Sequence, residues 1–164
     1  MFVRDVVCNG ERDFAMKRTV ALLHAWLPVF FMMSVIFYFS HQRAAESSKL
    51  SGSLTEAVAI VIEALVPFMT IDSEFLHFFI RKGAHFTVYF ILGVTLIRAC
   101  SIYFARKRRA LYAFIIACLY AISDEVHQLF IPGRSGEIGD VLIDSFGALI
   151  GIFIYLRIRR KFCR

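Results

Sequence analysis

The stretch AISDEVHQLFIPGRSGEIGDVLID, residues 121–144, decides how the rest of this chain is interpreted. An apolar run beginning at Ala110 leads into it, and a second apolar run follows it. Between the two runs lie several ionisable side chains and a turn signal, Pro132-Gly133. Ionisable groups are costly at hydrocarbon depth, so they normally face the interior of a helix bundle or a wet cavity. The stretch therefore predicts a functional site within a membrane protein.

The composition of the whole chain also indicates a membrane protein. Of its 164 residues, 59% are hydrophobic and 18 are Phe, which is far from the averages of soluble proteins. The net charge of +6 comes from short basic clusters beside apolar runs, without a basic face that alternates with aromatic residues. We therefore expect no nucleic-acid partner. The four Cys residues lack CxxC spacing, so neither a disulfide framework nor a thiolate zinc site is indicated.

Four apolar runs are candidate transmembrane helices. A helix needs roughly 20 apolar residues to span a bilayer. The uninterrupted apolar part of each later run is shorter than this, because polar residues occupy one end of the run. The predicted spans are Val20–Phe39, Phe75–Ile97, Ala110–Phe130 and Val141–Leu156. No small-residue cleavage site follows the first run, so we expect it to remain as an anchor. The predicted organisation is a cytoplasmic segment (1–18), one transmembrane domain (19–160) and a cytoplasmic tail (161–164).

A fifth, amphipathic helix is predicted between the first two spans, over Ser53–Leu65. Its apolar residues recur at helical spacing, but the segment is too short and too charged to span a bilayer. Ser53 followed by Glu56 resembles a capping box, and Pro67 ends the pattern. We expect this helix to lie at the membrane interface.

The distribution of basic residues predicts the orientation of the spans. Segments 1–18, 98–109 and 157–164 contain 14 of the 19 Lys and Arg residues. Because basic flanks remain in the cytoplasm, both termini and the 98–109 loop are predicted to be cytoplasmic. The fold class is therefore an all-α integral membrane protein with four transmembrane helices and one interfacial helix, N-in and C-in. Its outward-facing connections are 40–74 and 132–139.

Helical geometry predicts that polar groups from three spans meet. Counted from the cytoplasmic ends of their spans, His85 and Asp144 lie roughly 18 Å up and Asp124 roughly 21 Å. Arg81, His85 and Tyr89 share one helix face because they are four residues apart. Further pairs and triplets at spacings of three or four are Asp124, His127 and Gln128; Asp140 and Asp144; Gly147 and Gly151. The glycine pair predicts close packing against another helix.

The polar blocks resemble those of the VanZ-like membrane proteins. The resemblance extends from about Val29 to Gly151 and consists of Phe37–Gln42 (FYFSHQ), Arg81–Phe86 (RKGAHF) with Tyr89 and Leu92-Gly93, Asp124-Glu125 with His127 and Gln128, Pro132-Gly133-Arg134, and Asp140 and Asp144 before Gly147 and Gly151. It implies a bacterial plasma-membrane protein of the cell envelope, in a family whose founding member is linked to resistance to the glycopeptide teicoplanin. The resemblance supplies a setting without a reaction.

Several functions remain open for this cluster. Arg81, Lys82 and Arg134 are suited to holding the anionic head group of a lipid or cell-wall precursor. His127 or His85, oriented by a neighbouring Asp, would give a hydrolase or transferase an acid-base pair. The alternative is a structural bundle held by an ion-pair network with no substrate. Candidate catalytic residues are His127, Asp124 and His85; candidate substrate-binding residues are Arg81, Lys82, Tyr89, Glu125, Gln128, Arg134, Asp140 and Asp144.

A metal site is the last alternative for the same residues. His85, Asp124, His127 and Asp144 carry suitable ligand atoms. The nearby cations argue against a bound metal ion, so we expect neither a metal nor another cofactor, and membrane lipids as the general partners.

Overall fold

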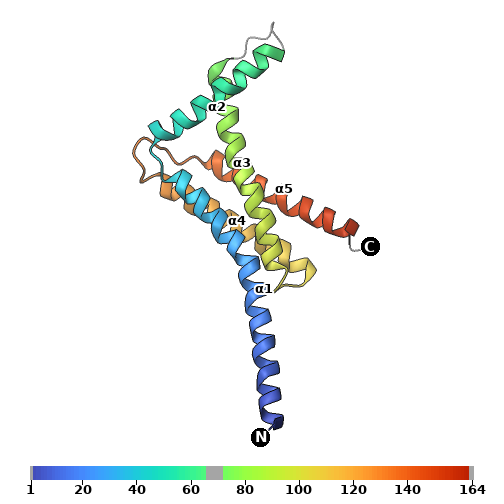
Figure 1. Ribbon diagram of the computed structural model, residues 1–164. Helices are drawn as coiled ribbons and strands as arrows, with labels where there is room; N and C mark the ends of the chain where they lie inside the picture. The colour runs from blue at the N-terminus through green and yellow to red at the C-terminus, as the bar shows by residue number, and fades with distance from the viewer. Residues whose placement is uncertain (1, 66–71, 163–164) are drawn as a thin grey trace.

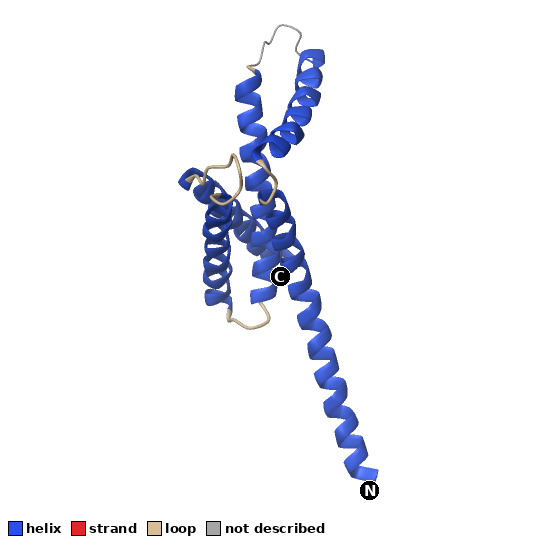
Figure 2. Ribbon diagram, turned by 90° about the vertical axis from the view of Figure 1, so that its left-hand side faces the viewer, coloured by secondary structure: helices blue, strands red, loops and turns tan. Residues whose placement is uncertain are grey.

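The computed structural model describes residues 2–65 and 72–162, and this part of the chain is helical without a strand (Figures 1 and 2). The five helices, in chain order, are α1 (Phe2–Ser40), α2 (Ala44–Leu65), α3 (Ser73–Cys100), α4 (Arg106–Gln128) and α5 (Ile138–Phe162). The all-α class predicted from the sequence is confirmed.

Helix α3 lies at the centre of the bundle and contacts each of the other four helices. Figure 1 shows it passing between α1 and α5, while the first part of α1 extends beyond the bundle toward the N-terminus. The core consists mainly of small and branched apolar side chains from α1, α3, α4 and α5. Helix α3 therefore provides the surface on which the other helices are positioned.

Glycines bring α3 and α5 into unusually close contact. A Cβ atom added at Gly93 would collide with the backbone of Ala148, and one added at Gly147 would lie 2.5 Å from the carbonyl oxygen of Phe86. A Cβ at Gly151 would likewise collide with the backbone of Phe90. The close packing predicted from the Gly147 and Gly151 pair is confirmed, and α3 is its partner.

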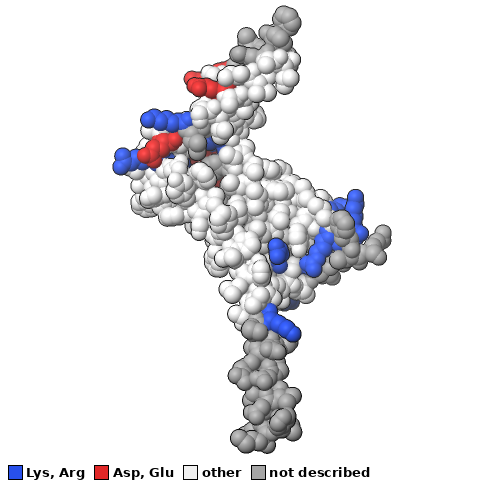
Figure 3. All heavy atoms as spheres, viewed as in Figure 1, with Lys and Arg blue, Asp and Glu red and all other residues white. Residues whose placement is uncertain are grey.

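Four helices are long and apolar enough to cross a membrane. These segments are Thr19–Ser40, Ser73–Cys100, Arg108–Gln128 and Ile138–Lys161. Large apolar side chains lie exposed on them, including Leu27 at 68% and Phe31 at 66%, as expected for surfaces covered by lipid. Figure 3 shows the middle of one face without a charged residue, while Lys and Arg appear toward the ends. The prediction of four spans is confirmed.

Helix α2 differs from the predicted interfacial helix at its start. It begins at Ala44, nine residues before Ser53, so Ser53 lies inside the helix and is not its N-cap. Ser51, early in α2, donates from Oγ to the Ser47 carbonyl at 2.9 Å and also lies 2.8 Å from His77 Nε2 on α3. Figures 1 and 2 show α2 beside the N-terminal part of α3, and its interfacial placement stays a prediction. Pro67, the predicted terminator, lies outside the described residues.

Candidate functional site

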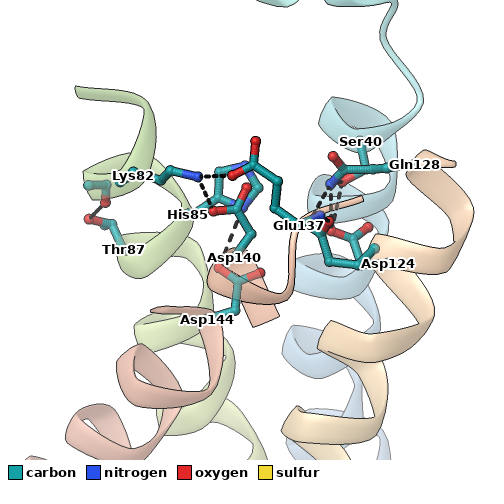
Figure 4. Close-up of polar contacts among 11 residues, drawn as sticks. Ser40, Lys82, His85, Thr87, Asp124, Gln128, Glu137, Asp140 and Asp144 are labelled. Carbon is teal, nitrogen blue, oxygen red and sulfur yellow. Dashed lines mark hydrogen bonds and ion pairs between the residues drawn. The ribbon is translucent and has the colours of Figure 1, made fainter. Parts of the chain in front are cut away.

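Most of the buried polar residues gather where α4 ends and α5 begins. Their side chains come from α1, α4 and α5, and each residue is between 0% and 5% exposed. They are Ser40, Asp124, Glu125, Gln128, Asp140 and Asp144. Figure 4 labels all of these residues except Glu125 and shows Lys82 and His85 reaching toward them from α3. The structure thus brings together groups from helices that are far apart in the sequence.

Gln128 links the carboxylates of α4. Its Nε2 atom donates to Asp124 Oδ2 and to Glu125 Oε1, each at 3.3 Å. Ser40 Oγ also donates to Asp124 Oδ2, at 2.9 Å, and connects the end of α1 to the same network. The second Glu125 oxygen accepts the backbone N–H of Glu137 at 2.8 Å. These donors fix both acidic side chains in orientation.

Lys82 forms the ion pairs at the edge of the cluster. Its Nζ atom contacts Asp140 Oδ1 and lies 2.9 Å from Glu137 Oε2. The two partners differ in environment, because the Asp140 side chain is 2% exposed and that of Glu137 is 52% exposed. Lys82 is therefore the direct counterion of a buried carboxylate.

His85 faces the carboxylate of Asp144. The distance from Nδ1 to Asp144 Oδ1 is 3.4 Å, which is an ion pair only when the ring is protonated. Neither Asp144 oxygen accepts a hydrogen bond within the described part of the chain, although the side chain is fully buried. His85, Asp124 and Asp144 thus come together as the estimated depths predict.

His127 lies on a different face of α4. Its ring stacks on Phe37, with centroids 4.8 Å apart, and its Nε2 lies 3.3 Å from His41 Nδ1. It forms no hydrogen bond with Asp124, the partner that their spacing suggests. His85 and Asp144, instead of His127 and Asp124, are the directly apposed histidine and carboxylate in the described cluster.

A pocket of about 240 Å³ opens beside the cluster. Its wall combines apolar side chains, among them Ile36, Leu54 and Val88, with Arg81 and Arg134. The other site candidates on the wall are His85, Tyr89 and Asp124. The pocket is therefore apolar over much of its wall and carries two guanidinium groups.

The two arginines of the pocket have no carboxylate partner among the residues that the structure describes. Arg81 makes no hydrogen bond or ion pair to the described residues, and Arg134 donates from Nη2 to the Phe39 carbonyl at 2.9 Å. The buried Nε of Arg134 has no partner in the same part of the chain. Burial, and then repulsion from Arg81, lowers the pKa of Arg134, although a guanidinium stays protonated at neutral pH. A bound anion would relieve this repulsion.

Tyr89 adds a buried hydroxyl to the pocket wall. The residue is 0% exposed, and its hydroxyl has no hydrogen-bond partner in the described chain. Its ring centroid lies 6.3 Å from that of Tyr120, which itself donates to the Met33 carbonyl. Tyr89 therefore retains a donor that a bound ligand can use.

Sequence reasoning missed two contributors to the cluster. Ser40 was assigned to a loop, whereas it is the last residue of α1 and donates to Asp124. Glu137 was treated as part of the turn, whereas its backbone holds Glu125 and its side chain pairs with Lys82. Both residues lie next to the end of a predicted span at the depth of the polar cluster, and this position is the feature of the sequence that could have predicted their role.

The cluster and the pocket beside it combine side chains with different chemical properties. Two sets of groups have ligand atoms within 4.8 Å of one another: His85, Glu125 and Asp140 in one, and Asp124, Glu125 and Asp144 in the other. The pocket arginines supply fixed positive charge, and His85 supplies an imidazole that is suited to proton transfer. Anion binding, proton transfer and cation binding are all compatible with this donor set.

Comparison with known proteins assigns the chain to a family. No curated protein and no solved structure gives a significant match. A family model described as VanZ/LLP1 matches residues 25–159, which include the four candidate spans almost entirely and every residue of the polar cluster. The chain is a multi-pass membrane protein by its four apolar helices, and it belongs to the VanZ/LLP1 family.

Proposed function

We propose that this protein binds the anionic head group of a membrane lipid or cell-wall precursor in the pocket beside Arg81 and Arg134. The observation that carries the proposal is the placement of two guanidinium groups, without carboxylate partners in the described part of the chain, on an otherwise largely apolar wall. Arginine binds phosphate and carboxylate through paired N–H donors, and the apolar wall suits the first part of an acyl or prenyl chain.

We further propose that the pocket faces outward from a bacterial plasma membrane. The basic segments lie at the opposite ends of the spans from the pocket, and basic flanks remain cytoplasmic. Family membership links the chain broadly with glycopeptide resistance. Glycopeptides of the teicoplanin type act on cell-wall precursors outside the membrane, so a protein that binds such a head group at this surface would be able to shield it.

The binding proposal is tested by thermal unfolding of the purified full chain in a neutral detergent. Lipids with a phosphate monoester or diphosphate head group, tested beside a zwitterionic lipid of the same chain length, are expected to raise the melting temperature. A shift of several degrees corresponds to ligand at many times its dissociation constant. If no anionic lipid shifts the transition more than the zwitterionic one does, the pocket is not a head-group site and the ion-pair scaffold is favoured.

The orientation is tested by labelling at Ser135, an exposed residue next to Arg134. With the native cysteines replaced, Ser135→Cys is expected to react with an impermeant maleimide in intact cells. Arg98→Cys, at the other end of α3, is expected to react only after the membrane is permeabilised. The reverse pattern would place the pocket in the cytoplasm and remove the envelope setting.

His85 gives a second candidate function. It lies on the pocket wall and faces Asp144, so a ligand in the pocket would meet an imidazole oriented by a buried carboxylate. This is the arrangement of a general base in a hydrolase or transferase. If His85→Gln retains head-group binding but loses an envelope phenotype, catalysis is favoured; if only the arginines matter, binding alone is sufficient.

A further inference from the structure

We infer that Asp124, Glu125 and Asp144 hold a divalent cation and that His85 supplies an imidazole ligand to the same ion. The ligand oxygens of the three acidic residues lie within 4.8 Å of one another, and each residue is at most 5% exposed. Glu125 also belongs to the second set, with His85 and Asp140. A single ion next to Glu125 therefore has carboxylate oxygens from two helices and an imidazole from a third within reach.

The carboxylate of Asp144 points to a missing positive charge. It is fully buried, and its two oxygens accept no hydrogen bond in the described part of the chain. Its ion-pair partner in the described part of the chain is His85, at 3.4 Å, which compensates the charge only when protonated. A buried carboxylate without hydrogen bonds or a counterion is very unfavourable, whereas a coordinated cation satisfies both oxygens.

The cations that argue against a metal ion in the sequence do not occupy this position. Lys82 pairs with Glu137 and Asp140, and the ion pairs of the described residues place neither Arg81 nor Arg134 within 4.0 Å of a carboxylate. Asp124, Glu125 and Asp144 therefore carry three formal negative charges, and no Lys or Arg whose side chain is described forms an ion pair with them. The reason for expecting no metal is removed by the geometry.

The remaining hydrogen bonds suit the orientation of metal ligands. Ser40 and Gln128 both donate to Asp124 Oδ2, so neither of these donors occupies Oδ1. Glu125 is held by Gln128 at one oxygen and by the Glu137 backbone at the other. Such outer donors are typical of ligating carboxylates, because they fix the position of the remaining lone pairs.

The donor set indicates the class of ion. Carboxylate oxygens bind Mg²⁺, Ca²⁺ and Mn²⁺, whereas imidazole favours transition metals such as Mn²⁺ and Zn²⁺ over Mg²⁺ and Ca²⁺. Because His85 and Asp124 also line the pocket, an ion held here would be accessible to a ligand in it. We expect Mn²⁺ or Zn²⁺ to bind more tightly than Mg²⁺ or Ca²⁺.

The test uses the full chain, stripped with a chelator and titrated separately with the four ions. Calorimetry and elemental analysis are expected to give about one equivalent of Mn²⁺ or Zn²⁺. Asp144→Asn and Glu125→Gln are expected to weaken binding of the ion at least tenfold. Loss of a group that only hydrogen-bonds to a metal ligand already lowers metal affinity about 10- to 100-fold, and these two residues are themselves ligands. Glu56→Gln, an exposed acid on α2, serves as the matched control and is expected to bind like the unaltered chain.

A spectroscopic measurement keeps the inference testable if a carboxylate variant fails to fold. Pulsed electron paramagnetic resonance of the Mn²⁺ form is expected to show coupling to an imidazole nitrogen that is lost in His85→Gln and retained in His127→Gln. Absence of bound ion in the unaltered chain, or binding that persists unchanged in both carboxylate variants, would overturn the site. Coupling that disappears with His127 instead of His85 would equally contradict it.

Discussion

Lys82→Met is expected to destabilise the protein by about 3–5 kcal/mol, the cost of removing one partner from a buried ion pair. Lys82 is 14% exposed, and it is the ion-pair partner that contacts Asp140, which is almost completely buried. The substitution preserves most of the side-chain volume but leaves the Asp140 charge without its counterion. Reversible unfolding in mixed micelles measures the difference in the free energy of unfolding.

The two carboxylates bound to Lys82 give this prediction an internal control. Glu137 is 52% exposed, so Glu137→Gln removes a solvent-screened pair and is expected to change stability by less than about 1 kcal/mol. The double variant Lys82→Met with Asp140→Asn is expected to recover much of the loss, because no uncompensated buried charge remains. If Lys82→Met and Glu137→Gln lower the free energy of unfolding equally, the burial of Asp140 does not determine how much stability is lost.

The spans were predictable because the membrane imposes a length and a composition that the sequence shows directly. The first and last helices nevertheless extend well beyond Val20–Phe39 and Val141–Leu156, since a helix does not have to end where the hydrocarbon does. The predicted start of α2, at Ser53, was too late, because the helix begins at Ala44. Its first turns, rich in Ser and Ala, lack an apolar period, and Ser51 donates to a carbonyl of the preceding turn.

The composition of the polar cluster was predictable, whereas the pairing within it was not. Positions three and four residues after Asp124 lie about 60° to one side and 40° to the other on a helix of 3.6 residues per turn. Both were therefore assigned to the same face. In the fold, Gln128 turns inward to Asp124 and Glu125, and His127 turns toward Phe37 at the end of α1. The position of α1 determines that Gln128, and not His127, contacts Asp124. Helical spacing within α4 contains no information about the position of α1.

Replacing both pocket arginines is expected to lower the affinity for an anionic head group by more than about tenfold. A hydrogen bond to a charged group contributes about 1.5–3 kcal/mol, so each of Arg81→Gln and Arg134→Gln should weaken binding at least about tenfold. Arg81 is the cleaner site, because it has no hydrogen bond or ion pair to the described residues, whereas Arg134 also bonds to Phe39. Dissociation constants from lipid titration of the single and double variants form a double-mutant cycle.

Arg98→Gln is the matched control for this cycle, because Arg98 is an exposed arginine at the opposite end of α3 from Arg81. Its loss should reduce only non-specific attraction of anionic lipid, which salt screens, so affinity at high ionic strength should stay unchanged. Two arginines that hold one phosphate should also be energetically coupled, so the effects of the single substitutions should not simply add. Independent, additive losses of the size seen in Arg98→Gln would mean that lipid is attracted by surface charge and that the pocket is not the binding site.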